Sequence, residues 1–191
     1  MNLIISLLLK LFLVFAGIFA VFFGDWNNLF LSILTLILTF LPNIIERRFK
    51  VIFPANLEVV IVFFLYASLY LGEVQLFYIK FWWWDLFLHF LSGVIMAIIG
   101  FALVRILNKH KDLKINPLLV VIFSFCFSLT IGVIWEVFEF FVDLTFRFNM
   151  QKSGLIDTMT DIVLDILGAS AVSILGYIHL KNPKFLKDLV K

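Results

Sequence analysis

The chain has 191 residues, of which 63% are hydrophobic and only 15% are charged. Because soluble domains carry roughly a quarter charged residues, this composition excludes a soluble globular protein. The formal net charge of +2 gives no support to a nucleic-acid partner, and a lone cysteine excludes an internal disulfide. We therefore expect an all-α, polytopic transmembrane helical bundle that forms a single integral membrane domain over residues 1–191.

Stretches long enough to cross a bilayer recur along the whole chain. A membrane-spanning helix needs about 20 mostly apolar residues, within a range of about 17–25. We predict six spans, at residues 3–23, 29–45, 57–72, 85–107, 117–142 and 162–180. The second and third are short for a span, so their ends are the least sharply defined.

The distribution of Lys and Arg predicts the orientation of these spans. With a cytoplasmic N-terminus, all basic residues except Lys80, Arg147 and Lys152 fall on the cytoplasmic side. Cytoplasmic loops are enriched in Lys and Arg, so we predict that both termini are cytoplasmic, in the cell membrane of a prokaryote. The five tryptophans, a residue type that favours membrane interfaces, then all lie near the outer face.

Acidic residues follow the opposite pattern and recur at helical spacing near the outer face. Residues three or four positions apart share one face of a helix. The resulting stripes are Asp85 with His89, Glu136 with Glu139, and Asp157 with Asp161 and Asp165. Because successive spans run in opposite directions, all three stripes lie in the same leaflet. We expect them to face one another and to line a pocket open to the outside.

This concentration of charge predicts a metal site. Neighbouring carboxylates repel one another, and each ionisable group within a span costs about 2.5–3.5 kcal/mol on insertion scales. A divalent cation offsets both effects, and carboxylate oxygens with one imidazole suit Mg, Mn, Fe or Zn, at one or two sites. The expected ligands are Asp85, His89, Glu136, Glu139, Asp161 and Asp165. Asp157 is either a further ligand or the cap of the last helix.

Residues beside the stripes have plainer structural interpretations. We expect Asp25 and Asp143 to be solvated charges in connectors. Gly93 and Gly168 follow the first and third stripes by about one turn, and such small residues let helices approach closely.

The predicted site allows three kinds of function, each with membrane lipids as partners. The first is a metal-dependent enzyme acting on a lipid or lipid-linked substrate from the outer leaflet, with one carboxylate as general base. The second is a transporter of a divalent cation or protons, which needs a polar path to the cytoplasm; Ser124, Ser128, Thr130 and Ser173 are the available groups. The third is a scaffold stabilised by metal. A hydrated vestibule without metal is the structural alternative.

The chain also resembles a known family through these same motifs. They are Asp85-x-x-x-His89-x-x-Ser92-Gly93, Trp135-Glu136-x-x-Glu139 and Asp157-Thr158-x-x-Asp161-x-x-x-Asp165-x-x-Gly168. In order and approximate spacing the motifs are similar to the YjdF-like family of predicted inner-membrane proteins, over roughly residues 80–175. The resemblance implies a small polytopic helical membrane protein and carries no assigned reaction. A more distant likeness is to VanZ-like membrane proteins.

Overall fold

This computed structural model describes residues 2–49, 55–111, 115–147 and 149–182. In this part of the chain, helices account for all the regular secondary structure. The elements are α1 (Asn2–Phe23), α2 (Trp26–Leu38), α3 (Leu41–Phe49), α4 (Ala55–Leu65), the π-helix η1 (Tyr66–Val74), α5 (Phe77–Lys80), α6 (Trp84–Lys111), α7 (Pro117–Phe146) and α8 (Leu155–Lys181). The chain divides into two compact units, Met1–Leu88 and His89–Lys191, and the boundary falls inside α6. That the whole chain forms a single domain stays a prediction.

Six segments of the described chain are long and apolar enough to cross a membrane, which confirms the all-α transmembrane bundle expected from the sequence. They are Ile4–Phe23, Trp26–Arg48, Leu57–Val74, Trp84–Arg105, Pro117–Phe146 and Leu155–Lys181. The orientation of the two termini stays a prediction.

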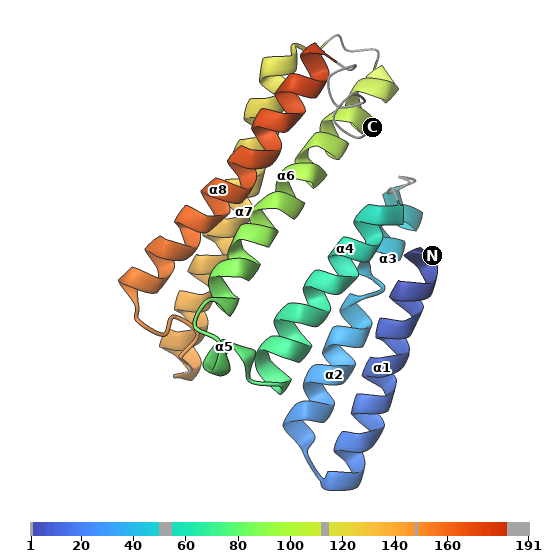
Figure 1. Cartoon of the computed structure of the whole chain (residues 1–191), viewed down its shortest axis with the longest axis vertical. Coiled ribbons are helices and arrows are strands. Elements are labelled where there is room, and N and C mark those ends of the chain that lie inside the picture. The colour runs from blue at the N-terminus through green and yellow to red at the C-terminus, as the bar shows by residue number, and fades with distance from the viewer. Residues whose placement is uncertain (1, 50–54, 112–114, 148, 183–191) are drawn as a thin grey trace. The chain divides into compact units, whose positions relative to one another are not determined.

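In the N-terminal unit, α1 packs against α2 and α4, and η1 packs against α2, α4 and α5 (Figure 1). The second span is interrupted between α2 and α3 at Thr39 and Phe40. Pro42 explains the interruption, because proline lacks the N–H that would continue the α2 hydrogen-bond ladder, yet fits the first turn of a new helix. This break lies inside a stretch that the sequence predicts as one continuous span.

The third span changes from α-helix to π-helix at Tyr66. At its end the Gln75 backbone N–H donates to the Tyr70 carbonyl, five residues earlier, at 3.0 Å. Gly72 lies against the Tyr78 ring so closely that a Cβ there would overlap the ring. A π-helical segment is rare and often marks a functional site, so this part of the N-terminal unit is a candidate for one.

The C-terminal unit consists of most of α6 together with α7 and α8, which lie side by side (Figure 1). Glycines let the backbones of these helices touch. A Cβ on Gly100 would lie 2.8 Å from the Ser124 Cα, and a Cβ on Gly168 would overlap the Phe90 carbonyl oxygen. Gly100 therefore joins α6 to α7, and Gly168 joins α8 to α6. This contact agrees with the close packing of helices expected at Gly168.

Candidate functional site

Four ionisable side chains are buried together in the C-terminal unit. His89 comes from α6, Glu136 from α7, and Asp161 and Asp165 from α8; they are 7%, 4%, 1% and 2% exposed. Burial of this degree is rare for acidic side chains, which are almost never fully buried without a partner. The helices thus bring part of each predicted stripe to a common interior point.

His89 lies at the centre of this cluster, and its ring faces three carboxylates, two at Nε2 and one at Nδ1. Its Nε2 is 3.8 Å from Glu136 Oε1 and 3.9 Å from Asp161 Oδ2. One ligand atom from each of His89, Glu136 and Asp161 can be chosen so that all three lie within 4.8 Å of one another. We call these three residues the trio; together they present one nitrogen and two carboxylates to a single point.

Asp165 lies on the opposite side of the His89 ring from the trio's carboxylates. Its Oδ2 is 3.3 Å from His89 Nδ1, and its Oδ1 accepts a hydrogen bond from the Ser92 hydroxyl at 2.6 Å. In the tautomer that donates from Nδ1 to Asp165, the Nε2 lone pair points to Glu136 and Asp161. A carboxylate placed in this way can orient a histidine ring, and a ligand role for Asp165 stays a prediction.

Two glycines hold Asp165 in place. A Cβ on Gly93 would overlap the Asp165 backbone carbonyl, and a Cβ on Gly132 would lie 2.5 Å from Asp165 Oδ2. Any larger residue at either position would displace the helix or the carboxylate. The sequence indicates close helix packing at Gly93, but it contains no signal for the role of Gly132.

Within the trio, the burial of the Glu136 carboxylate is the least compensated by hydrogen bonds. Neither of its carboxylate oxygens has a hydrogen-bond partner among the described residues, although the Thr158 side chain lies beside it. An ionised carboxylate can accept about four hydrogen bonds, and leaving such a group buried without them is costly. The site thus contains a carboxylate that faces His89 through Oε1 and has few hydrogen bonds to compensate its burial.

The other predicted ligands lie outside the trio. Glu139 accepts a hydrogen bond at one oxygen from the Trp135 indole N–H at 3.0 Å, on its own helix. Asp85 lies one turn before His89 on α6 and is partly exposed. Asp157 lies one turn before Asp161 on α8 and is also partly exposed. A ligand role for these three residues stays a prediction.

The N-terminal end of α8 differs from the sequence prediction. The helix begins at Leu155 instead of near residue 162, and its N-cap position is Gly154, with φ of 65°. Asp157 is therefore inside the first turn and does not cap the helix. The physical reason is that Gly154 can adopt this positive φ without strain, so the turn ends three residues earlier than an Asp157 cap would require.

Two acidic residues expected to be solvated also organise their surroundings. Asp143 accepts hydrogen bonds from the backbone N–H groups of Met150 at 2.8 Å and Gln151 at 2.9 Å. Asp25 caps α2 by accepting from the Asn28 backbone N–H at 3.1 Å. Both carboxylates compensate backbone donors that would otherwise be unpaired near helix ends.

Asp143 thereby places a glutamine that the sequence analysis missed. Gln151 Nε2 donates to Thr158 Oγ1 at 2.8 Å and approaches the Glu136 backbone carbonyl at 3.5 Å. The connector between α7 and α8 is thus tied to both helices beside the trio. No helical periodicity could have indicated this, because Gln151 lies between helices.

Comparison with known proteins identifies the family. A family model described as "Predicted membrane protein (DUF2238)" matches residues 1–182, so the chain belongs to that family, and the YjdF-like resemblance is confirmed. An "Uncharacterized protein" of Thermotoga maritima is 28% identical over 139 residues, which cover 72% of this chain and 70% of the relative. No solved structure matches the chain. The VanZ-like likeness stays a prediction.

Proposed function

We propose that this member of the DUF2238 family is a metal-dependent membrane enzyme acting on a lipid or lipid-linked substrate. The observation that carries the proposal is the buried trio of His89, Glu136 and Asp161, whose ligand atoms lie within 4.8 Å of one another. The metal and the substrate class are both part of the proposal.

Charge balance supports a cation in this cluster. Glu136, Asp161 and Asp165 bring up to three negative charges, and a protonated His89 offsets at most one of them. Ionisable groups at this depth are expensive in a membrane protein and usually mark function. A divalent ion compensates the remaining charge and satisfies the Glu136 oxygens, which have no hydrogen-bond partner among the described residues.

The distances suit ligation of a single ion. Metal–ligand bonds are about 2.0–2.2 Å long. Two ligand atoms on opposite sides of one ion are therefore at most about 4.4 Å apart. The separations of 3.8 Å and 3.9 Å from His89 Nε2 to Glu136 and Asp161 are within this limit. Small rotations of the carboxylates complete the arrangement. One nitrogen and two carboxylates leave coordination positions for water and substrate, as catalytic sites require.

The residues then have separate roles in the proposed reaction. His89, Glu136 and Asp161 would hold the ion, which would supply Lewis-acid activation of a water molecule or of a substrate oxygen. Asp165 keeps His89 in the tautomer whose Nε2 is a ligand, and Ser92 holds Asp165. Glu136 can bind through one oxygen and accept a proton at the other, the role of a general base.

Depth favours a lipid as the substrate. Asp161 lies six residues into α8, or about 9 Å along the helix axis at 1.5 Å per residue. Near this depth the large apolar side chains of the same helix, Met159 and Val163, are exposed on its outside. A substrate that approaches along such a surface must be apolar in part, which describes a lipid or a lipid-linked group.

The test is the metal content of detergent-purified protein by mass spectrometry, for wild type beside Glu136→Gln and Glu139→Gln. We expect near-stoichiometric metal in the wild type and a loss of about 10-fold or more in Glu136→Gln, which removes a ligand charge. Glu139→Gln is the matched control, three residues along the same helix and bonded to Trp135. It should retain the metal.

A protein that takes up no metal under loading with Mg, Mn, Fe or Zn overturns the proposal. Equal loss in both variants would show that Glu139 is a ligand as well, as the sequence predicts, and would overturn the site of three residues. If metal is present, hydrolysis or transfer of lipid substrates should disappear on chelation and return on reloading. Metal removal that only lowers the melting temperature would support the scaffold function instead.

Transport of protons or cations is the second candidate. The buried Ser173 hydroxyl has no hydrogen-bond partner among the described residues, so it could belong to a polar path. Ser124 and Ser128, however, already donate to the backbone carbonyls of Val120 and Gly93. Flux measured in liposomes and abolished by Asp165→Asn would favour transport over catalysis.

A further inference from the structure

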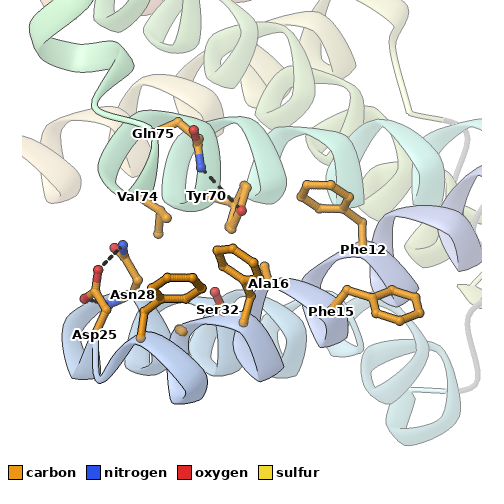
Figure 2. A pocket seen from close by; sticks show the side chains of 12 residues that line it. Phe12, Phe15, Ala16, Asp25, Asn28, Ser32, Tyr70, Val74 and Gln75 are labelled. Carbon is orange, nitrogen blue, oxygen red and sulfur yellow. Dashed lines mark hydrogen bonds between the residues drawn. The ribbon is translucent and has the colours of Figure 1, made fainter.

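The N-terminal unit contains a groove that the proposed metal enzyme does not use. Its volume is about 490 Å³, and it lies between α1, the start of α2 and the end of η1 (Figure 2). One wall is formed by aromatic rings spaced three or four residues apart on α1. They are Phe12, Phe15, Phe19 and Phe23. Every residue that lines the groove belongs to the N-terminal unit.

The groove has a polar end at the turn between α1 and α2. Asp25 lines it there and accepts hydrogen bonds from the Asn28 backbone N–H at 3.1 Å and from Asn28 Nδ2 at 2.6 Å. On the facing segment Gln75 Nε2 donates to the Tyr70 hydroxyl at 3.4 Å (Figure 2). The carboxylate and the Gln75 amide oxygen keep acceptor capacity beyond these bonds.

A buried hydroxyl lines the same groove. Ser32 is 1% exposed, and its Oγ has no hydrogen-bond partner among the described residues. It also borders a smaller cavity of about 250 Å³, but the other residues around that cavity are all apolar. Apart from the carbonyls of its own helix, a polar partner for Ser32 can therefore come only from the larger groove, and burying a hydroxyl without one is unfavourable.

From this groove we propose a lipid-binding site for a single-chain lipid whose headgroup is neutral or carries an amine. The aromatic wall from Phe12 to Phe23 extends over about 16 Å at 1.5 Å per residue. That is about half of a hydrocarbon core of about 30 Å, the depth of one leaflet. The acyl chain lies along the rings, and the headgroup lies at Asp25, Asn28 and Gln75.

Charge selects the headgroup. The residues lining the groove include one carboxylate, Asp25, and neither lysine nor arginine. A phosphate without a compensating cation would be repelled by Asp25, whereas a hydroxyl or an ammonium group can donate to it. Ser32 contacts an oxygen nearer the start of the acyl chain, such as that of an ester. The groove is lined by the N-terminal unit alone, so lipid binding there does not depend on metal binding by the trio.

The experiment is photo-crosslinking of the full chain in detergent with a monoacylglycerol that carries a diazirine in its acyl chain. Peptide mass spectrometry locates the adducts, with monoolein and lysophosphatidylglycerol as competitors. Ala16→Phe fills the groove, and Ser32→Ala removes only the hydroxyl. Ala171→Phe is the matched control, because Ala171 is exposed on α8 and remote in sequence from the groove.

We expect adducts on α1 or η1 that monoolein displaces and lysophosphatidylglycerol does not. Their yield should fall about 10-fold in Ala16→Phe, because the ring takes the place of the chain. It should fall about 2- to 10-fold in Ser32→Ala, the effect of one hydrogen bond, and stay unchanged in Ala171→Phe.

Adducts spread over the exposed faces of many helices, and unchanged in both groove variants, would overturn the site and indicate lipid that merely surrounds the protein. Equal competition by lysophosphatidylglycerol would overturn the headgroup assignment. Because Ser32→Ala makes a small change inside a helix, it keeps the test decisive if Ala16→Phe does not fold.

Discussion

Two fully buried hydroxyls, one from each unit of the chain, are bonded in different ways. In the N-terminal unit, the fully buried Thr35 donates to the Leu31 carbonyl of its own helix at 2.7 Å. In the C-terminal unit, the equally buried Ser128 donates from α7 to the Gly93 carbonyl of α6 at 2.8 Å. A bond within one helix satisfies the hydroxyl without choosing a neighbouring helix. A bond between helices also determines how they are aligned, as the Ser128 bond does for α6 and α7, although Ser124 of the same unit bonds within its own helix.

Glycine use differs in the same way. A Cβ on Gly17 of α1 would meet only side-chain atoms of Leu29 and Ser32, at 3.7 Å and 3.9 Å. Those are ordinary van der Waals distances. A Cβ on Gly93 would instead overlap the Asp165 backbone. The first glycine is replaceable, whereas the second is required by the approach of two backbones beside the trio.

Replacing each of these glycines with alanine should give the largest difference in the free energy of unfolding between the two units. Gly93→Ala should lower the free energy of unfolding by about 1–3 kcal/mol, because backbone atoms of α8 cannot move aside as a flexible side chain can. Gly17→Ala should raise it by up to about 1 kcal/mol, since alanine favours a helix. Reversible unfolding in mixed micelles measures both. Equal destabilisation by the two changes would contradict the proposed difference.

A second variant tests whether the interhelical contacts in the C-terminal unit serve the trio. Asp165→Asn keeps the size of the side chain but weakens the hold on His89 Nδ1, so metal affinity should fall about 10- to 100-fold. Equilibrium dialysis against the metal found in the wild type measures this. Ser92→Ala, which removes one hydrogen bond to Asp165, should have a smaller effect in the same direction. An unchanged affinity in Asp165→Asn would show that His89 is oriented by other contacts.

The smallest expected effect on the free energy of unfolding comes from removing one buried hydroxyl from each unit. Ser128→Ala removes a bond between helices and should lower the free energy of unfolding by about 0.6 kcal/mol, the average for such bonds in membrane proteins. Thr35→Val removes a bond within one helix and should change it by no more than a few tenths of a kcal/mol. The same micelle unfolding assay applies. A larger loss in Thr35→Val would mean that α2 depends on this hydroxyl for its shape.

The spans could be predicted closely because the information is local. Length and apolar composition are sufficient to recognise a segment that can cross a bilayer, and all six are present in the described chain. Their ends were less predictable. Gly154 starts α8 at Leu155, and Pro42 divides the second span, because turn conformation and a missing backbone donor act on single residues.

The candidate site could be predicted only in part, as Glu136 and Glu139 show. Residues three apart on a helix differ by about 60° around its axis. That rotation points Glu136 to His89, at 3.8 Å, and leaves Glu139 bonded to Trp135. Periodicity indicates that two side chains share a face, but it does not say which of them meets the neighbouring helix.

The sequence by itself determined that this protein is a six-span helical membrane protein with acidic stripes on its last three spans, since both depend on residues close together in the chain. Only the tertiary structure decided that His89, Glu136 and Asp161 converge while Asp165 supports the other side of the ring. It also decided that Ser32 borders an aromatic groove. These arrangements depend on how helices rotate and how closely their backbones approach, and both are settled by packing between residues far apart in the chain.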